Sequence, residues 1–196
     1  MTTNILLCGV GGQGIITASA VLAEAALLSG CDVKKSEVHG MSQRGGSVET
    51  HVRFSRDGAV HSPLIPAGAA DVLLAFEILE ALRNVPMTRP EGAVITDNRQ
   101  IVPMSVTAGA FEYPTDPAAD LRATGRAIHI VPGFDIALAL GEPRAANMVL
   151  LGAASALIDI AGEVWPEAMR AHLRPKALEA SLKAFEAGLA ALSGKT

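Results

Sequence analysis

Short apolar runs alternate with longer segments rich in Ala, Leu and Ile along most of the chain, a pattern typical of strands followed by helices. The predicted strands are Ile5–Cys8, Cys31–Ser36, Asp71–Phe76, Gly92–Asp97 and Ala127–Val131. The predicted helices are Ile15–Leu28, Glu77–Asn84, a short helix from Asp135 that ends near Gly141, Arg144–Ala161 and Lys176–Leu192. This order predicts an α/β fold with a Rossmann-like, mostly parallel sheet and helices on both faces.

One segment departs from this order, because apolar and polar residues alternate with a period of two from Val48 to Ser55. Such alternation is typical of a half-buried strand. Arg56–Gly58 can then turn the chain into Ala59–Ser62, so the sequence predicts an antiparallel hairpin inserted into the parallel sheet. His51 and His61 would face each other across this hairpin, and we interpret them as surface residues, because no third metal ligand is evident.

The composition supports one folded domain that spans residues 1–196. Apolar residues make up 49% of the chain and charged residues 18%, which is enough apolar surface for a large core. No linker divides the 196 residues. Aromatic residues are only 4% and the net charge is -4, so the chain lacks the stacking platforms and the basic surplus of a nucleic-acid-binding protein.

The two cysteines, Cys8 and Cys31, lie in apolar surroundings and outside any C-x-x-C or C-x-x-H spacing. We interpret them as buried structural thiols, and the thiolates of this chain cannot assemble a metal cluster alone. The N-terminus has no basic region, Ile5–Val10 is too short for the core of a signal peptide, and no apolar run is long enough to cross a membrane. These observations predict a cytoplasmic protein.

A glycine-rich turn joins the first predicted strand to the first predicted helix. Its spacing is G-x-G-x-x-G, with Gly9, Gly11 and Gly14 at the glycine positions and Gly12 and Gln13 between them. Such a turn lets a phosphate approach backbone amides at a helix N-terminus. The same glycines can serve only the close packing of strand against helix, so a phosphate site and a purely structural turn are both open.

A dinucleotide site would also need an acidic residue at the end of the second strand, where it holds a ribose hydroxyl. Lys34 and Lys35 occupy this region, and Glu37 comes slightly late. A nicotinamide dinucleotide site is therefore open but without clear support.

Glu37–Gly46 combines charged, imidazole, amide and thioether groups with three glycines in ten residues. The glycines disfavour a helix and the segment lacks the alternation of a strand, so it is predicted to be a loop. Polar loops on rigid scaffolds are frequent binding sites. Parallel sheets bind ligands at the carboxyl ends of their strands, and both this loop and the glycine turn leave from those ends. We therefore expect the two segments to be neighbours.

Asn147 is the polar exception near the start of the predicted helix Arg144–Ala161, which is apolar on nearly all faces. It is either a polar residue that faces solvent near a helix N-terminus or an amide that meets a ligand or a partner. The last predicted helix, Lys176–Leu192, carries an amphipathic stripe that either packs on the domain or docks a partner.

Three motifs closely resemble the gamma-type component of the 2-oxoacid:ferredoxin oxidoreductases, and together they span most of the chain. They are Gly9-Val10-Gly11-Gly12-Gln13-Gly14-Ile15, Ser36-Glu37-Val38-His39-Gly40-Met41-Ser42-Gln43-Arg44-Gly45-Gly46 and Asn147-Met148-Val149-Leu150-Leu151-Gly152. The second motif is most similar to the small beta subunits of the indolepyruvate branch, because the pyruvate and 2-oxoglutarate branches tend to carry a different lead-in to Arg-Gly-Gly.

The resemblance implies an oxidative decarboxylation in which a 2-oxoacid and coenzyme A give an acyl-CoA and carbon dioxide, and electrons pass to ferredoxin. The chain lacks both the Gly-Asp-Gly…Asn-Asn pattern of thiamine diphosphate sites and the cysteines for iron–sulfur clusters. The resemblance therefore implies a larger partner subunit that holds thiamine diphosphate and iron–sulfur clusters. The small chain would complete the active site or share the coenzyme A site.

Within this resemblance Arg44 is the first candidate, because its guanidinium can bind a carboxylate or a pyrophosphate through two hydrogen bonds. His39 and Gln43 can hydrogen-bond substrate or cofactor, and Met41 offers a polarizable contact to an aromatic substrate. Each residue can instead hold the interface between subunits. The candidate catalytic residues are therefore Arg44, His39 and Gln43, and the candidate cofactor-binding residues are Gly9, Gly11, Gly12, Gln13, Gly14, Gly45, Gly46 and Asn147.

Two other classes of function are open. The first is a free-standing Rossmann-type oxidoreductase that uses the glycine turn to bind NAD(P). The second is a non-catalytic scaffold whose polar loop only contacts a partner protein.

Overall fold

A six-stranded sheet forms the centre of the structure, a computed structural model that describes residues 1–39, 46–102 and 113–194. The strands lie in the order β2-β3-β1-β4-β5-β6. Their bounds are Thr3–Val10 (β1), Asp32–His39 (β2), Ser47–Ser55 (β3), Ala70–Ala75 (β4), Thr88–Asp97 (β5) and Ala127–Val131 (β6). β1, β4, β5 and β6 are parallel, whereas β3 lies between β1 and β2 and is antiparallel to both. The prediction of a mostly parallel sheet with an antiparallel insertion is confirmed.

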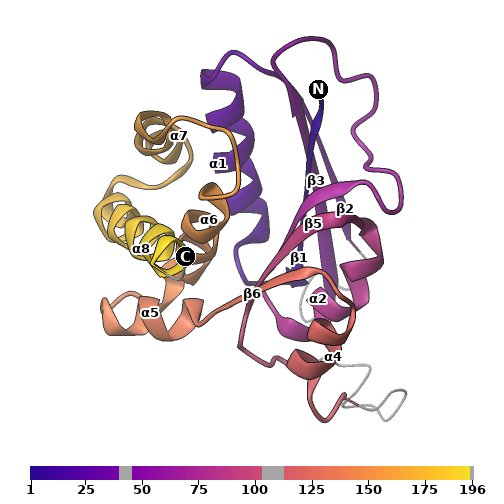
Figure 1. Cartoon of the computed structure of the whole chain (residues 1–196). Helices are drawn as coiled ribbons and strands as arrows, with labels where there is room; N and C mark the ends of the chain where they lie inside the picture. The colour runs from indigo at the N-terminus through magenta and orange to yellow at the C-terminus, as the bar shows by residue number, and fades with distance from the viewer. Residues whose placement is uncertain (40–45, 103–112, 195–196) are drawn as a thin grey trace.

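Helices cover both faces of the sheet, as the sequence pattern predicts (Figure 1). Successive residues of a strand point to opposite faces of the sheet. In β1, Leu7 is buried in the core beneath one helical layer, and the preceding residue, Leu6, is buried in the core beneath the other layer. The first layer contains α1 (Ile15–Leu28), α5 (Gly133–Ala139), α6 (Ala146–Ser155), α7 (Trp165–His172) and α8 (Pro175–Ser193), and the second contains α2 (Ile78–Asn84) and α4 (Pro117–Ala123).

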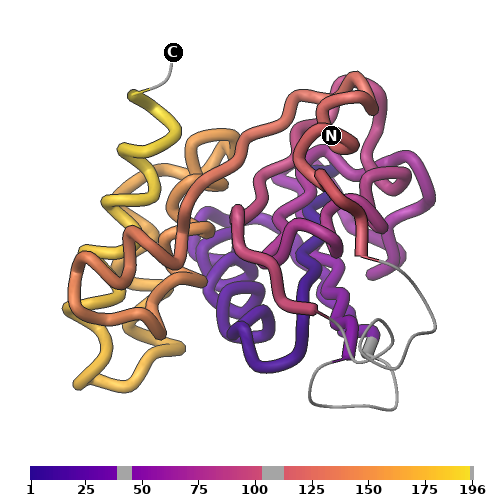
Figure 2. The backbone as a smooth tube through the Cα atoms, turned by 90° about the horizontal axis from the view of Figure 1, so that it is seen from below, coloured from indigo at the N-terminus to yellow at the C-terminus, as the bar shows by residue number. Residues whose placement is uncertain are grey.

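α6 packs on the sheet against β4 and β5, whereas α7 packs on α1 and α8 packs on α6, so these last two helices form an outer layer. Figure 2 shows the molecule from below, with the yellow helix α8 on one side of the indigo helix α1 and strands on its other side. Across the ranges 1–39, 46–102 and 113–194, no helix is both long enough and apolar enough to cross a membrane.

The antiparallel partner of β3 differs from the prediction. Ala59–Ser62 forms no strand, and β3 instead pairs along its length with β2 and β1. β2 continues to His39, so it offers β3 a much longer ladder than the four residues of the predicted partner. Val60 is buried and donates its amide hydrogen to the Asp32 carboxylate (2.6 Å), which holds this segment beside β2 without strand pairing.

The predicted facing pair of histidines is therefore wrong. His51 is buried on β3, and its Nδ1 accepts a hydrogen bond from the Ile65 amide (3.2 Å). Burial, and next the charge of Arg53, lowers the pKa of His51, which suits its role as a neutral acceptor. His61 is exposed, as a surface residue should be.

Several helix boundaries also differ from the prediction. The predicted helix Arg144–Ala161 is a short 3-10 turn, Pro143–Ala145, followed by α6, which ends at Ser155. Trp165 begins α7, whose Pro166 is compatible with the first turn of a helix. The Trp165 indole packs against the Phe185 ring at 5.1 Å between centroids, and this contact holds α7 against α8. Pattern analysis also missed α4 and the 3-10 turns Val85–Met87 and Gly162–Val164.

Two glycines let α6 and α8 approach each other backbone to backbone. A Cβ atom on Gly188 would overlap the backbone of Val149, and one on Gly152 would overlap the backbone of Phe185. Glycine normally weakens a helix interior, so at both positions the close approach outweighs the loss of helix propensity.

We predict that Gly188→Ala destabilises the protein by about 1–3 kcal/mol, because the new methyl group forces α8 away from α6. Urea unfolding of the purified chain measures the effect. Gly162→Ala is the matched control, because a Cβ atom there meets open space. Equal stability of the two variants would contradict this account of the helix contact.

Candidate functional site

A cavity of about 740 Å³ opens at the carboxyl ends of the parallel strands. Its lining comes from the glycine turn after β1, the ends of β4 and β5, and the starts of α5 and α6. The lining residues include Gly11, Gly12, Gln13, Gly14, Phe76, Asp97, Arg99, Phe134, Arg144 and Asn147. This is the place where open α/β sheets bind ligands.

The glycine turn needs glycine at three positions. Gly12 and Gly14 have φ angles of 107° and 79°, in the left-handed region that residues with a side chain rarely adopt. A Cβ atom on Gly9 would lie 2.9 Å from Cβ of Phe76, so this glycine lets β1 pass close to the end of β4. Gly14 precedes the first residue of α1, whose first-turn amides lack partners within the helix.

Gln13 fastens the turn to the neighbouring strand. Its Oε1 accepts a hydrogen bond from the Val10 amide (2.7 Å), and its Nε2 donates to the Phe76 carbonyl (2.5 Å). Both polar ends of the side chain are thus engaged inside the protein. The predicted candidate lines the cavity, but its observed bonds support the turn.

Asn147 is buried and reaches the glycine turn from α6. Its Nδ2 donates to the Gly14 carbonyl (3.2 Å), and a Cβ atom on Gly14 would lie 2.5 Å from that nitrogen. Of the two alternatives that the sequence leaves open, the solvent-facing one is wrong. Asn147 joins the starts of α1 and α6 at the cavity wall.

The expected contact between the polar loop and the glycine turn is confirmed. The Gly11 amide donates to the Gly46 carbonyl (2.9 Å), because β3 begins at Ser47 directly beside Val10. Glu37–His39 is not part of a loop but the end of β2, where it pairs with β3. Met41, Gln43, Arg44 and Gly45 lie outside the described residues, so their roles stay predictions.

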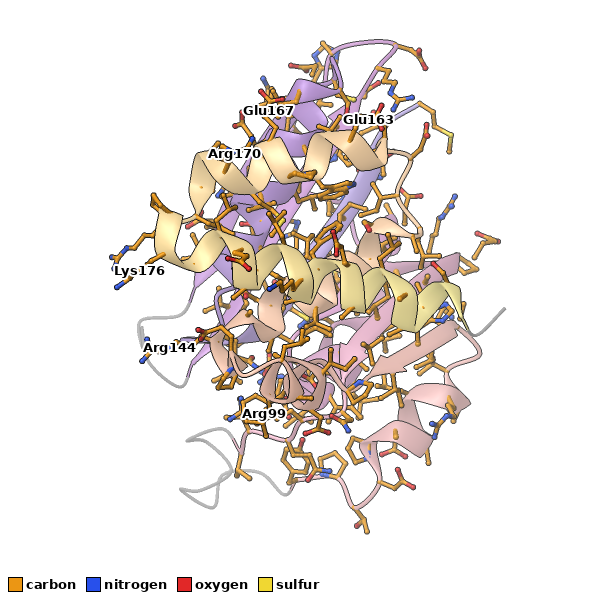
Figure 3. The ribbon with its side chains drawn as sticks, turned by 90° about the vertical axis from the view of Figure 1, so that its left-hand side faces the viewer. Arg99, Arg144, Glu163, Glu167, Arg170 and Lys176 are labelled. Carbon is orange, nitrogen blue, oxygen red and sulfur yellow. The ribbon has the colours of Figure 1, made fainter. Side chains whose placement is uncertain are left out.

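Two arginines that sequence reasoning missed line the cavity. Arg99 follows β5 and Arg144 precedes α6, and Figure 3 shows both at the same end of the molecule. Within the described part of the chain, neither guanidinium lies within 4.0 Å of a carboxylate. The cavity therefore carries two positive charges without ion pairs, which suits an anionic ligand. For Arg99 the available signal was its position just after the end of β5, whereas Arg144 lies in the turn between α5 and α6 and had no such signal.

Asp97, the last residue of β5, is buried beneath these charges. Its oxygens accept hydrogen bonds from the backbone amides of Arg99 (3.2 Å) and Phe134 (3.1 Å). Burial raises the pKa of Asp97, while the amides and the Arg99 charge oppose that rise.

Glu77, which precedes α2, is fully buried and holds the segment that contains Ile101, another residue of the cavity lining. Its carboxylate caps α2 by accepting from the Glu80 amide (3.0 Å), and it also accepts from the Ile101 amide (3.2 Å) and the Tyr113 hydroxyl (2.7 Å). Burial, and then Glu77, raises the pKa of Tyr113, so the hydroxyl keeps its proton and remains a donor.

Both cysteines are buried and free, as predicted. Burial, followed by the charge of Glu80, raises the pKa of Cys8 well above its usual value, which disfavours a reactive thiolate. Among the residues that the structure describes, no group of three or more His, Cys, Asp or Glu side chains is placed to hold a metal ion.

Glu49 generates a prediction about pH. Burial and the charge of Glu80 raise the pKa of Glu49 above its ordinary value of 4.5. Above the raised pKa the folded protein must hold an unfavourable charge, so the ionisation of Glu49 lowers the free energy of unfolding. This loss of stability disappears as pH falls toward 4.5. We expect Glu49→Gln to stabilise the protein at about pH 8 and to lose this advantage in acid. Urea unfolding at both pH values measures it. Glu91→Gln, an exposed strand residue, is the control, and an equal pH response would contradict the prediction.

Comparison with known proteins finds similarity along nearly the whole chain. The family model for pyruvate ferredoxin/flavodoxin oxidoreductase matches residues 4–191. The indolepyruvate oxidoreductase subunit IorB of Methanothermobacter thermautotrophicus is 41% identical over 197 residues, which cover 97% of this chain and 98% of that protein.

Solved structures share the fold of this chain. The gamma subunit of a keto/oxoacid ferredoxin oxidoreductase from Geobacter sulfurreducens superposes with a TM-score of 0.73 at 23% identity, covering 98% of this chain and 99% of the other. The 2-oxoglutarate:ferredoxin oxidoreductase of Magnetococcus marinus, solved with 2-oxoglutarate, coenzyme A and succinyl-CoA, gives a TM-score of 0.76 at 25% identity. The match covers all of this chain but 32% of that one.

Proposed function

Because the chain belongs to the pyruvate ferredoxin/flavodoxin oxidoreductase family, we propose that it is the small subunit of a thiamine diphosphate-dependent 2-oxoacid ferredoxin oxidoreductase. Similarity to the indolepyruvate subunit supports indolepyruvate or another aryl pyruvate as the 2-oxoacid. The 2-oxoacid and coenzyme A would give an acyl-CoA and carbon dioxide, with electrons passed to ferredoxin. The proposal places the complex in the cytoplasm.

A larger partner subunit is the second part of the proposal. This chain matches only 32% of the Magnetococcus chain, so in that protein the same fold is continuous with further polypeptide. The two cysteines of this chain are buried, and its described residues supply no cluster of metal ligands. Thiamine diphosphate and the iron–sulfur clusters are therefore assigned to the partner, which would also meet ferredoxin.

The cavity with two arginines, neither of which forms an ion pair within the described residues, is the observation that carries a role in coenzyme A binding. Coenzyme A bears several phosphate groups, and its thiol accepts the acyl group. Arg99 and Arg144 can bind those phosphates, while Gly12 and Gly14 let them approach the first-turn amides of α1. Gly46, the last residue of the polar loop, lies against the glycine turn. Arg44, His39 and Gln43 are proposed to meet substrate or cofactor.

We predict that Arg144→Ala, in the assembled complex, raises the KM for coenzyme A about tenfold, because one charged phosphate contact is lost. The KM for the 2-oxoacid and the assembly of the complex on gel filtration should not change. Arg170→Ala is the control, because Arg170 is exposed on α7, away from Arg144 (Figure 3). An unchanged KM for coenzyme A, or dissociation of the complex, would favour a scaffold role.

The position of β3 favours this proposal over a free-standing NAD(P) oxidoreductase. β3 separates β1 from β2, so the end of β2 lies about 10 Å away across two strand spacings, instead of beside the glycine turn. Glu37 at that end forms an ion pair with Lys35 (2.8 Å). Glu37, the candidate acidic residue for a ribose, is therefore not next to the turn.

Titration of the purified chain with NADH and NADPH, followed by fluorescence, tests this alternative. We expect no stoichiometric binding of either nucleotide at micromolar concentrations. Tight binding of one nucleotide per chain would overturn the subunit proposal in favour of a dehydrogenase. Loss of that binding in Gly12→Val would locate it at the glycine turn.

A further inference from the structure

Asp97 connects two elements on either side of the cavity. Its Oδ1 binds the Arg99 amide (3.2 Å) just after β5, and its Oδ2 binds the Phe134 amide (3.1 Å) in the first turn of α5. One carboxylate thus fixes the distance between these two backbones. Gly133 leaves room for it, because a Cβ atom there would lie 3.3 Å from Oδ2 and 3.0 Å from Leu150.

The two residues that Asp97 joins also interact through their side chains. The guanidinium carbon of Arg99 lies 4.1 Å from the centroid of the Phe134 ring, a favourable distance between a cation and an aromatic face. A second backbone contact holds the same place, since the Arg99 carbonyl accepts from the Ile78 amide (3.4 Å). The exposed, flexible arginine is therefore anchored at its backbone and oriented by the ring.

The burial of Asp97 carries a cost that a neutral residue would avoid. The side chain is 2% exposed and forms no ion pair within 4.0 Å in the described part of the chain. A buried charge is tolerated when hydrogen bonds compensate it, and here both oxygens accept from amides that flank one cation–π pair. These two amides belong to the two residues of the cation–π pair, so the hydrogen bonds of the buried carboxylate hold that pair.

We propose that Asp97 is a positioning residue for the anionic ligand of the cavity, acting through Arg99. It holds Arg99 and Phe134 together, so that the guanidinium is presented to the cavity in one orientation and loses less conformational entropy when a phosphate binds. Asp97 lines the cavity but is 2% exposed and has both oxygens bonded to backbone amides, so its role is to position Arg99. This inference rests on the proposed function, in which the ligand is coenzyme A.

The test uses the assembled complex and a double-mutant cycle. In Asp97→Asn one oxygen remains an acceptor and the new amide group opposes the other N–H donor, so only one of the two tethers persists. We expect the KM for coenzyme A to rise about tenfold, as for loss of a charged hydrogen bond, and kcat to fall less than twofold. Adding Asp97→Asn to Arg99→Ala should raise that KM no further, because the two residues act as one unit.

Two further variants keep the test decisive. Phe134→Leu leaves the amide tethers but removes the ring, so it should raise the KM for coenzyme A in the same direction even if Asp97→Asn folds poorly. Asp135→Asn is the matched control, because it removes an exposed carboxylate from the same turn of α5, and its KM should stay within twofold.

The outcomes separate this inference from the proposed function. If Asp97→Asn lowers kcat and raises both KM values equally, with or without Arg99, its role is structural and the inference is wrong. If Arg144→Ala weakens coenzyme A but Arg99→Ala does not, the inference fails and the proposed site stands. If neither arginine matters, the proposed coenzyme A site itself fails.

Discussion

The placement of β3 between β1 and β2 is the constraint on which the rest of the site depends. An antiparallel strand there must begin where β1 ends, so Ser47 lies beside Val10 and Gly46 meets Gly11. The same insertion moves the end of β2 away from the glycine turn. The antiparallel direction of β3 therefore has two effects. It brings the end of the polar loop to the cavity, and it moves away from the cavity the strand that carries the acidic residue in dinucleotide sites.

Buried carboxylates organise the cavity without neutralising it. Glu77 and Asp97 each accept backbone amides from two segments, so their charges are met by N–H dipoles. Arg99 and Arg144 then face the cavity with no carboxylate within 4.0 Å in the described ranges. A chain with a net charge of -4 thus contains a local positive region, which attracts anions by position rather than by overall charge.

The sequence predicted most of the fold but only part of this site. Periodicity located all six strands of the described sheet, since Val48–Ser55 alternates and the parallel strands are continuous apolar runs. It failed for Ala59–Ser62, because strand pairing depends on partners distant in the chain, and for α7, because the contact between Trp165 and Phe185 is tertiary.

The glycine turn and Asn147 were recognisable because their residue types are unusual in their settings. Asp97 and Arg99 are ordinary residues at the end of an ordinary strand, and only their geometry distinguishes them. Phe134 likewise gains its role from a cation that lies 35 positions earlier in the chain. The local sequence pattern does not predict such long-range contacts. The rule that ligands bind at the carboxyl ends of parallel strands predicts the region of the site but not its residues.

The glycine contact between α6 and α8 has a consequence for the opposite end of α6. Gly152 lies five residues after Asn147, about 7.5 Å along the helix axis, so the depth at which α8 seats α6 also sets how closely Asn147 approaches Gly14. The contact between α6 and α8, on the outer side of the molecule, thus influences the width of the cavity mouth. The last helix therefore supports a site that it does not line. Its glycine at the contact sets the distance between α8 and α6, and through α6 it affects the geometry of the cavity.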